Sequence, residues 1–319
     1  MEKVVAVTVT YNSSDFLRRC VKGLMQQSHS IMKIIIVDNH SDIAHKSINE
    51  NLIQNSIIDY CYLEENSGGA GGFEFGMKRA LKYAPDWIWI MDDDAFPDSD
   101  CLDKLLQHKD YPNLGCICPA IYGVENQAFQ VYHHKRISKF FLTDKPKYKS
   151  YEKFPDVFEI DANAFVGPLI STTVINDIGV AKGALFIYGD DTEYTYRLTR
   201  KYKMIVVKNA IIRHRDFITN DSNKINPNGW WKTYYMFRNR FLFAKEFSKN
   251  RLHYLILTLY WRMQICNRII NACINPKFKR YRKIRISILQ RAIKDGINGR
   301  AGKLLDPNEY LYLLNKIIS

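Results

Sequence analysis

Residues 87–94 read WIWIMDDD, an unbroken apolar run that ends in three consecutive carboxylates. A run of this kind is typical of a strand buried on both faces of a sheet. In an extended chain alternate side chains share one side, so Asp92 and Asp94 project together while Asp93 points away. The stretch therefore predicts a buried strand with a pair of carboxylates at its end.

Similar apolar runs lie on the N-terminal side, at residues 4–9, 34–37 and 57–63. Helical patterns follow the first and third of them, at about residues 16–24 and 72–83. Strands that alternate with helices predict a mostly parallel sheet flanked by helices, an α/β fold of Rossmann-like type. In such sheets ligands bind beyond the carboxyl ends of the strands, where the polar residues of this chain lie.

The pattern weakens after residue 120 and becomes helical after Asn228. We predict one catalytic α/β domain over residues 1–245, with halves of about 1–120 and 120–245. A basic amphipathic helical extension follows over residues 246–319.

Composition narrows the function classes. The 319 residues are 46% apolar, enough for a large core, and the seven cysteines are scattered, as expected in a reducing cytoplasm. Cys116 and Cys118 are expected to face the core rather than form a metal pair. The start leaves no room for a secretion signal, and no apolar run approaches the ~20 residues of a membrane span. A net charge of +13, concentrated after Lys245, indicates an anionic partner such as nucleic acid, acidic lipid or a phosphorylated substrate.

Each polar motif has a functional and a structural interpretation. Asp92 and Asp94 could hold Mn²⁺ or Mg²⁺ through oxygen, or form a solvated acidic turn. Asp38 could accept hydrogen bonds from a nucleotide, or belong to an ordinary turn. The glycine-rich stretch at residues 66–73 allows close backbone approach to a ligand, or is a flexible turn. It has the spacing of neither the Walker loop nor the dinucleotide fingerprint.

Two later motifs also have both a functional and a structural interpretation. The stretch GDDTE at residues 189–193 joins an apolar run to a helical pattern. A carboxylate there could be a general base, or Asp and Thr could cap the helix. His214 could bind a metal or a phosphate group, or be structural.

The chain resembles a family 2 glycosyltransferase with the GT-A fold, because five motifs occur in the order of that family. They are TYN at residues 10–12, VDN at 37–39, the glycine-rich stretch, the triple Asp and GDDTE. The resemblance covers about residues 4–245. More narrowly, the glycine-rich stretch, the Asp triplet and the downstream His214 are similar to bacterial galactofuranosyltransferases, which use UDP-galactofuranose. Some rhamnosyltransferases, with dTDP-rhamnose as donor, share the glycine-rich stretch.

The resemblance implies a role for each motif, with the donor in the first half of the domain and the acceptor in the second. Asp191 would be the base that deprotonates the acceptor hydroxyl. The metal ligands would be Asp92, Asp94 and His214. The nucleotide sugar would contact Thr10, Tyr11, Asn12, Asp38, Asn66, Gly68, Gly69, Gly71, Gly72 and Asp93. The acceptor would contact Asp190, Glu193, Trp230 and Trp231, although the two tryptophans fit ordinary helix packing equally well.

These roles imply a metal-dependent, inverting hexosyltransferase that works by single displacement. The chain lacks the additional domains of the large polymerising members, which favours transfer of one or a few sugars to a lipid-linked glycan in cell-surface polysaccharide synthesis, such as lipopolysaccharide O-antigen. The basic extension suits peripheral attachment to the inner face of the cell membrane, or a homo-oligomer contact.

The sequence supports two other classes of protein less well than a glycosyltransferase. A nucleotidyltransferase would have a glycine-rich signature with a basic residue near the N-terminus, where this chain has TYN. A nucleic-acid-binding protein would present basic and aromatic residues, whereas carboxylates end the strands here. We therefore expect no nucleic-acid partner.

Overall fold

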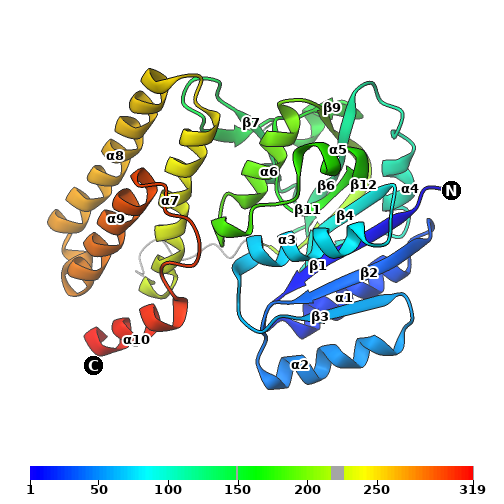
Figure 1. The fold of residues 1–319 in the computed structure, drawn as a ribbon, viewed down its shortest axis with the longest axis horizontal. Coiled ribbons are helices and arrows are strands. Elements are labelled where there is room, and N and C mark those ends of the chain that lie inside the picture. The colour runs from blue at the N-terminus through cyan, green and yellow to red at the C-terminus, as the bar shows by residue number, and fades with distance from the viewer. Residues whose placement is uncertain (149, 217–225, 319) are drawn as a thin grey trace. The chain divides into compact units, whose positions relative to one another are not determined.

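The computed structural model describes residues 1–148, 150–216 and 226–318 (Figure 1). The chain divides into two compact units. The first, here the α/β unit, comprises Met1–Ser138, Thr143–Gly183 and Asp191–Phe217. The second, the helical unit, comprises Lys139–Leu142, Ala184–Asp190 and Ile218–Ser319.

A nine-stranded sheet forms the α/β unit, in the order β3-β2-β1-β4-β11-β6-β12-β5 with β9 beside β12. Strands β1 to β4 are parallel, as are β6 and β12, while β11, β9 and β5 run antiparallel to their neighbours. The prediction of a mostly parallel sheet is confirmed. The strands of this sheet are β1 Val4–Thr10, β2 Ile31–Asp38, β3 Ile58–Tyr62, β4 Trp87–Asp92, β5 Ala95–Pro97, β6 Leu114–Gly123, β9 Val157–Glu159, β11 Val166–Ser171 and β12 Lys203–His214.

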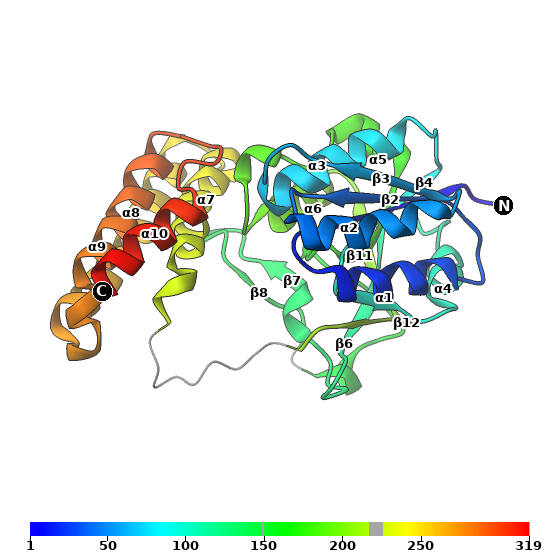
Figure 2. The same ribbon diagram turned by 90° about the horizontal axis from the view of Figure 1, so that it is seen from below.

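Helices cover both faces of the sheet (Figures 1 and 2). One apolar cluster joins the sheet to α1 and α4, and another joins it to α3, α5 and α6. Cys116 and Cys118 are buried in the second cluster, as expected. A small sheet, β10-β7-β8, completes the unit with β7 His134–Ile137, β8 Asp144–Pro146 and β10 Ala162–Asn163. The helices are α1 Ser14–Met25, α2 Ile43–Glu50, α3 Gly68–Leu81, α4 Cys101–Leu106, α5 Thr172–Ile178 and α6 Asp190–Thr199.

The glycine-rich stretch is helical, which corrects the prediction of a turn before residue 72. Its glycines form the first turns of α3, which begins at Gly68. A Cβ atom on Gly72 would lie 2.5 Å from Val9 Cγ1, and one on Gly76 would come still closer to Val7. The glycines at 72 and 76 therefore let the helix backbone lie directly on β1.

A matched pair of substitutions tests this close packing. Gly76→Ala should destabilise the fold by about 1–3 kcal/mol because the new methyl overlaps Val7. Gly69→Ala should be neutral or slightly stabilising, since nothing lies within 4 Å of its Cβ position and alanine favours helices. Urea denaturation followed by circular dichroism gives both values. Equal free energies of unfolding would show that α3 does not depend on this contact.

The helical unit consists of α7 Trp230–Phe247, α8 Arg251–Ile274, α9 Arg282–Ile297 and α10 Pro307–Ile318. Its core gathers aromatic and aliphatic side chains from α7, α8, α9 and α10, among them Tyr235, Phe241 and Leu289. Helix α7 therefore lies in this unit, before the boundary at residue 245 that the sequence suggested. Within the described residues, none of the helices combines the length and apolar character that crossing a membrane requires.

Candidate active site

Three predicted metal ligands meet at one edge of the sheet. Asp92 ends β4, and a tight turn leads from it into β5. Strand β5 runs antiparallel to β12 and places Ala95 opposite His214. As a result, ligand atoms of Asp92, Asp94 and His214 all lie within 4.8 Å of one another. Two carboxylates with an imidazole form a donor set that suits Mn²⁺ or a similar divalent cation.

The imidazole of His214 is oriented for such a role. Its Nδ1 lies 2.9 Å from the carbonyl oxygen of Arg215 and 3.1 Å from Gln130 Oε1. Both oxygens only accept, so Nδ1 carries the proton, and in the neutral ring Nε2 keeps its lone pair. That nitrogen lies 3.2 Å from Asp94 Oδ1. With the ring protonated this contact is an ion pair, and with the ring neutral the Nε2 lone pair and the carboxylate would be free to share a divalent cation. Gln130 and the Arg215 carbonyl are the outer partners that orient the ring.

Asp93 has a different environment from its neighbours. Thr10 Oγ1, at the end of β1, donates a 2.6 Å hydrogen bond to Asp93 Oδ2. Burial raises the pKa of the Asp93 carboxyl to about 7, with a contribution from the charge of Asp94 and in spite of the hydrogen bond from Thr10. Asp93 thus links the end of β4 to β1 and is not part of the group formed by Asp92, Asp94 and His214, here called the metal-type group. The sequence predicted this separation from alternation along a strand, whereas the structure places Asp93 and Asp94 in the turn after β4.

The end of β1 offers an accessible surface. Tyr11 is 46% exposed, and Asn12 adopts a positive φ of 51° that turns the chain outward. The Asn12 backbone N–H donates to Ser41 Oγ, and Asn12 Oδ1 accepts from the Asp42 backbone. These bonds fix the loop after β1 to the loop after β2.

Asp38 does not reach this surface. The side chain is fully buried and accepts from the Ser41 backbone and from Asn49 and Tyr60, at 2.7–2.8 Å. Three internal donors already hold this carboxylate in this structure, and its contact with a nucleotide stays a prediction. Asp38 orders the turn after β2.

Asn39 is a residue that the sequence argument did not single out. Its side chain accepts from the backbone and hydroxyl of Ser67 and donates to the carbonyl oxygen of Gly68. Asn66 Oδ1 in turn accepts from the Gly68 backbone at 2.8 Å. The two amides therefore hold the start of α3 beside the end of β2. The sequence hinted at this arrangement only by placing an asparagine after β2, at Asn39, and another just before α3, at Asn66.

The candidate base, Asp191, lies in the first turn of α6 with 22% of its side chain accessible. Its Oδ1 accepts from the Thr192 backbone at 2.6 Å, and its Oδ2 lies 3.1 Å from Lys135 Nζ. Lys135 comes from β7 and also donates to Thr192 Oγ1. The carboxylate is thus oriented at both oxygens and partly open to solvent. Lys135 was missed because 56 residues separate it from Asp191.

The turn before α6 is tightly held within the helical unit. Phe186, Tyr188 and Gly189 have positive φ angles, and the Asn239 amide donates to three carbonyl groups of this turn. The turn leads into Asp190, which is buried at the start of α6.

Two of the predicted acceptor residues have internal roles. Glu193 is buried and forms ion pairs with Arg197 and Lys182. Trp230 lies in the core of the helical unit beneath Arg285, whose guanidinium is 4.6 Å from the ring centre. We correct both assignments, because neither side chain presents a free face to an acceptor. Trp231 is partly exposed and contacts Phe186, so it keeps a surface for a sugar.

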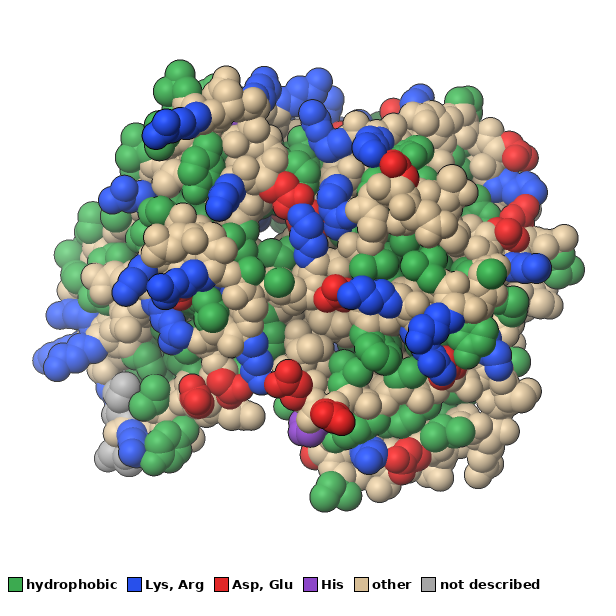
Figure 3. Space-filling view, in the orientation of Figure 1, with side chains coloured by type: hydrophobic (Ala, Val, Ile, Leu, Met, Phe, Trp, Pro, Cys, Tyr) green, Lys and Arg blue, Asp and Glu red, His purple; other side chains and the backbone are tan. Residues whose placement is uncertain are grey.

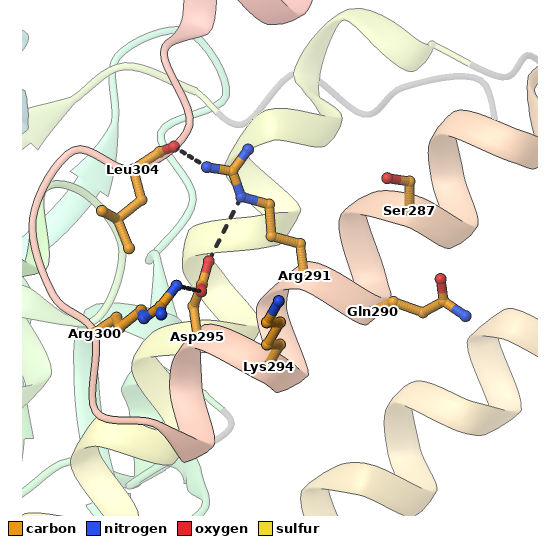
Figure 4. Close-up of a pocket in the computed structure, with 7 residues that line it drawn as sticks. All are labelled: Ser287, Gln290, Arg291, Lys294, Asp295, Arg300 and Leu304. Carbon is orange, nitrogen blue, oxygen red and sulfur yellow. Dashed lines mark hydrogen bonds and ion pairs between the residues drawn. The ribbon is translucent and has the colours of Figure 1, made fainter.

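A pocket of about 400 Å³ lies in the helical unit (Figure 4). The buried Asp295 carboxylate lies beside it, 3.5 Å from guanidinium nitrogens of Arg291 and Arg300, and accepts a hydrogen bond from Tyr234. The pair with Arg300 ties α9 to the turn that follows it. The pocket contains none of the residues of the candidate active site.

Solved structures with the same arrangement identify the fold. Three of them are GalNAc-T7 with UDP, GalNAc and Mn²⁺ (TM-score 0.64, 14% identity), S. aureus TarS 1-349 in complex with UDP (0.55, 14%), and the Pyrobaculum calidifontis mannosyltransferase PcManGT with GDP-Man and Mn²⁺ (0.55, 11%). Each similarity covers 93% of this chain, and 56%, 82% and 87% of the respective neighbour. The protein has the GT-A fold.

Sequence comparison gives the family. The sequence model described as Glycosyl transferase family 2 matches residues 5–168, just over half of the chain. The protein belongs to this family. It is 30% identical over 203 residues to galactofuranosyltransferase GlfT1 of Mycolicibacterium smegmatis, and 30% over 204 residues to GlfT1 of Mycobacterium tuberculosis. The matches cover 62% of this chain and 66% and 65% of those proteins, just under two thirds of their length.

Proposed function

We propose that this protein is a glycosyltransferase that transfers galactofuranose from UDP-galactofuranose, with inversion, to a lipid-linked oligosaccharide in cell-surface polysaccharide synthesis. The observation that carries the reaction class is the group formed by Asp92, Asp94 and His214 at the carboxyl end of β4. The similarity to the two GlfT1 proteins supports the donor.

The diphosphate would lie at this group, with Asp92, Asp94 and His214 holding Mn²⁺ or Mg²⁺. When bound, the cation neutralises the diphosphate and stabilises the charge that develops as UDP departs. Gln130 keeps the Nε2 lone pair of His214 directed toward Asp94. Tyr11 and Asn12 would contact the uridine from the exposed loop after β1, with Thr10 and Asp93 beneath them.

Asp191 is the base of this proposal. Its carboxylate receives the proton of the acceptor hydroxyl while that oxygen forms a bond to the anomeric carbon of the donor. The bond from the anomeric carbon to the diphosphate breaks, its electron pair leaves with UDP, and the configuration inverts. Lys135 and the Thr192 backbone hold the carboxylate in place for this step. Asp190 and Trp231 remain our candidates for contacts with the acceptor.

Thermal stabilisation by a donor panel tests this function. With Mn²⁺ present, UDP-galactofuranose should raise the melting temperature more than UDP-galactopyranose or dTDP-rhamnose at equal concentration, because the ligand with the lower Kd stabilises the folded state more. A larger shift with dTDP-rhamnose would identify a rhamnosyltransferase with the same mechanism. No shift with any nucleotide sugar would reject the proposal.

A lipid-linked acceptor requires the enzyme to work at a membrane surface. We place the protein at the inner face of the cell membrane as a peripheral protein, which fits the basic character of its C-terminal part.

A further inference from the structure

Helix α8 carries an apolar stripe that faces solvent. Its large apolar side chains at three- and four-residue intervals are 37–72% exposed, and they occupy one side of the helix along its whole length. We call this surface the α8 stripe. Its members are Leu252, Leu255, Ile256, Leu259, Met263, Ile270 and Ile274.

The opposite side of α8 already forms the core of the helical unit. Leu257, Ile265 and Ala272 are buried, and Trp261 lies under the guanidinium of Arg240 from α7. A helix that is apolar on both sides is expected to be covered on both. Packing within the unit therefore explains only one side of α8, and the α8 stripe needs another partner.

Two phenylalanines extend the α8 stripe. The short segment Lys139–Leu142 lies against the first half of α8, where the carbonyl oxygen of Phe140 accepts from His253 Nε2 and the Phe141 ring lies 5.1 Å from that of Tyr260. Both rings are more than 40% exposed. Exposed aromatic rings beside an aliphatic surface are typical of segments that lie at the membrane–water interface.

The charge around the stripe has one sign. Residues 247–294 contain twelve Lys and Arg and no Asp or Glu. Arg251 and Arg262 are exposed on α8 itself, and Lys277, Lys279 and Lys283 are exposed directly after it. Figure 3 shows Lys and Arg interspersed with apolar side chains over the part of the molecule where Figure 1 draws α8 and α9.

We propose that the α8 stripe, with Phe140 and Phe141, is a docking surface for an anionic membrane. The apolar side chains enter the boundary between headgroups and acyl chains, and the surrounding cations contact acidic headgroups, each worth about 1 kcal/mol near such a surface. A second copy of the chain fits less well, because a symmetric contact through this surface would bring together the exposed cations on and directly after α8 from both copies.

The test is co-sedimentation of the full chain with vesicles of phosphatidylcholine alone and with vesicles that also contain phosphatidylglycerol. The protein should bind the second kind, and added salt should weaken binding. Met263→Glu and, separately, Leu255→Glu should each lower partitioning into these vesicles about tenfold. Each removes one apolar side chain that the membrane would bury and adds repulsion between the new carboxylate and the acidic headgroups. Ile43→Glu is the matched control, because Ile43 is 83% exposed on α2 and should leave binding unchanged.

Several outcomes would overturn the proposal that the α8 stripe docks on a membrane. They are no binding to anionic vesicles, equal binding of the stripe variants and the parent, or a dimer in analytical ultracentrifugation that Met263→Glu dissociates while vesicles are not bound. Binding is measured without any donor, so the result is independent of which nucleotide sugar the enzyme uses. Circular dichroism of each variant shows that the exposed substitutions leave the fold intact.

Discussion

Asp191→Asn should lower the rate of sugar transfer by about a thousandfold, within the range that general-base catalysis contributes. The amide keeps the shape of the side chain and can still face Lys135, but it cannot accept a proton. The affinity for UDP with Mn²⁺ should stay within about twofold of the parent, because Asp191 is not among the metal-type ligands. A transfer assay measures the rate, and calorimetry on the same preparation measures the affinity for UDP.

Asp177→Asn serves as the matched control. Asp177 forms a similar carboxylate–lysine pair, with its Oδ2 3.0 Å from Lys201 Nζ, but on α5 and among none of the candidate site residues. Its replacement should leave transfer unchanged. Loss of UDP affinity in Asp191→Asn, or full transfer activity, would remove Asp191 from the role of base.

Asp94→Ala should weaken Mn²⁺ binding about a hundredfold or more, because it removes a direct ligand, and outer partners alone contribute about ten- to a hundredfold. Electron paramagnetic resonance of free Mn²⁺ measures this without donor or acceptor. Asp93→Asn is the control within the same turn. Its side chain is bonded to Thr10, so Mn²⁺ affinity should change little.

Unchanged Mn²⁺ affinity in Asp94→Ala would show that the cation, if any, lies elsewhere. An equal loss in Asp93→Asn would show that all three carboxylates act together. That result would contradict the separation of Asp93 from its neighbours.

The metal-type group was predictable because it depends on rules that act over short distances. The sequence rule of alternation gave the right grouping of Asp92 with Asp94, although a turn after Asp92 produces it here, and parallel strands bring their polar ends to one edge of the sheet. His214 also follows a buried strand, so its arrival at the same edge follows from topology. The pairing of β5 with β12 then sets the contact.

The surroundings of Asp38 and Trp230 could not be predicted because they depend on partners far away in the chain, whereas Glu193 pairs with Arg197 one helical turn later. Tyr60 occupies the carboxylate of Asp38, and Arg285 covers the ring of Trp230. A sequence pattern identifies a residue that can bind a ligand, but it does not show whether another side chain already occupies that residue. The same reason hid Lys135 and Gln130, which orient Asp191 and His214.

Local composition misled the interpretation of the glycine-rich stretch. Five glycines within nine residues normally disfavour a helix. Here close contact with β1 excludes larger side chains at Gly72 and Gly76, so packing outweighs propensity.

Calorimetric titration of UDP into the protein, with Mn²⁺ and again with excess chelator, tests the central claim most directly. We predict measurable binding with Mn²⁺ and its loss with chelator, because the diphosphate reaches Asp92, Asp94 and His214 through the cation. Equal binding under both conditions would contradict a metal-dependent site, and no binding under either would contradict the nucleotide site itself.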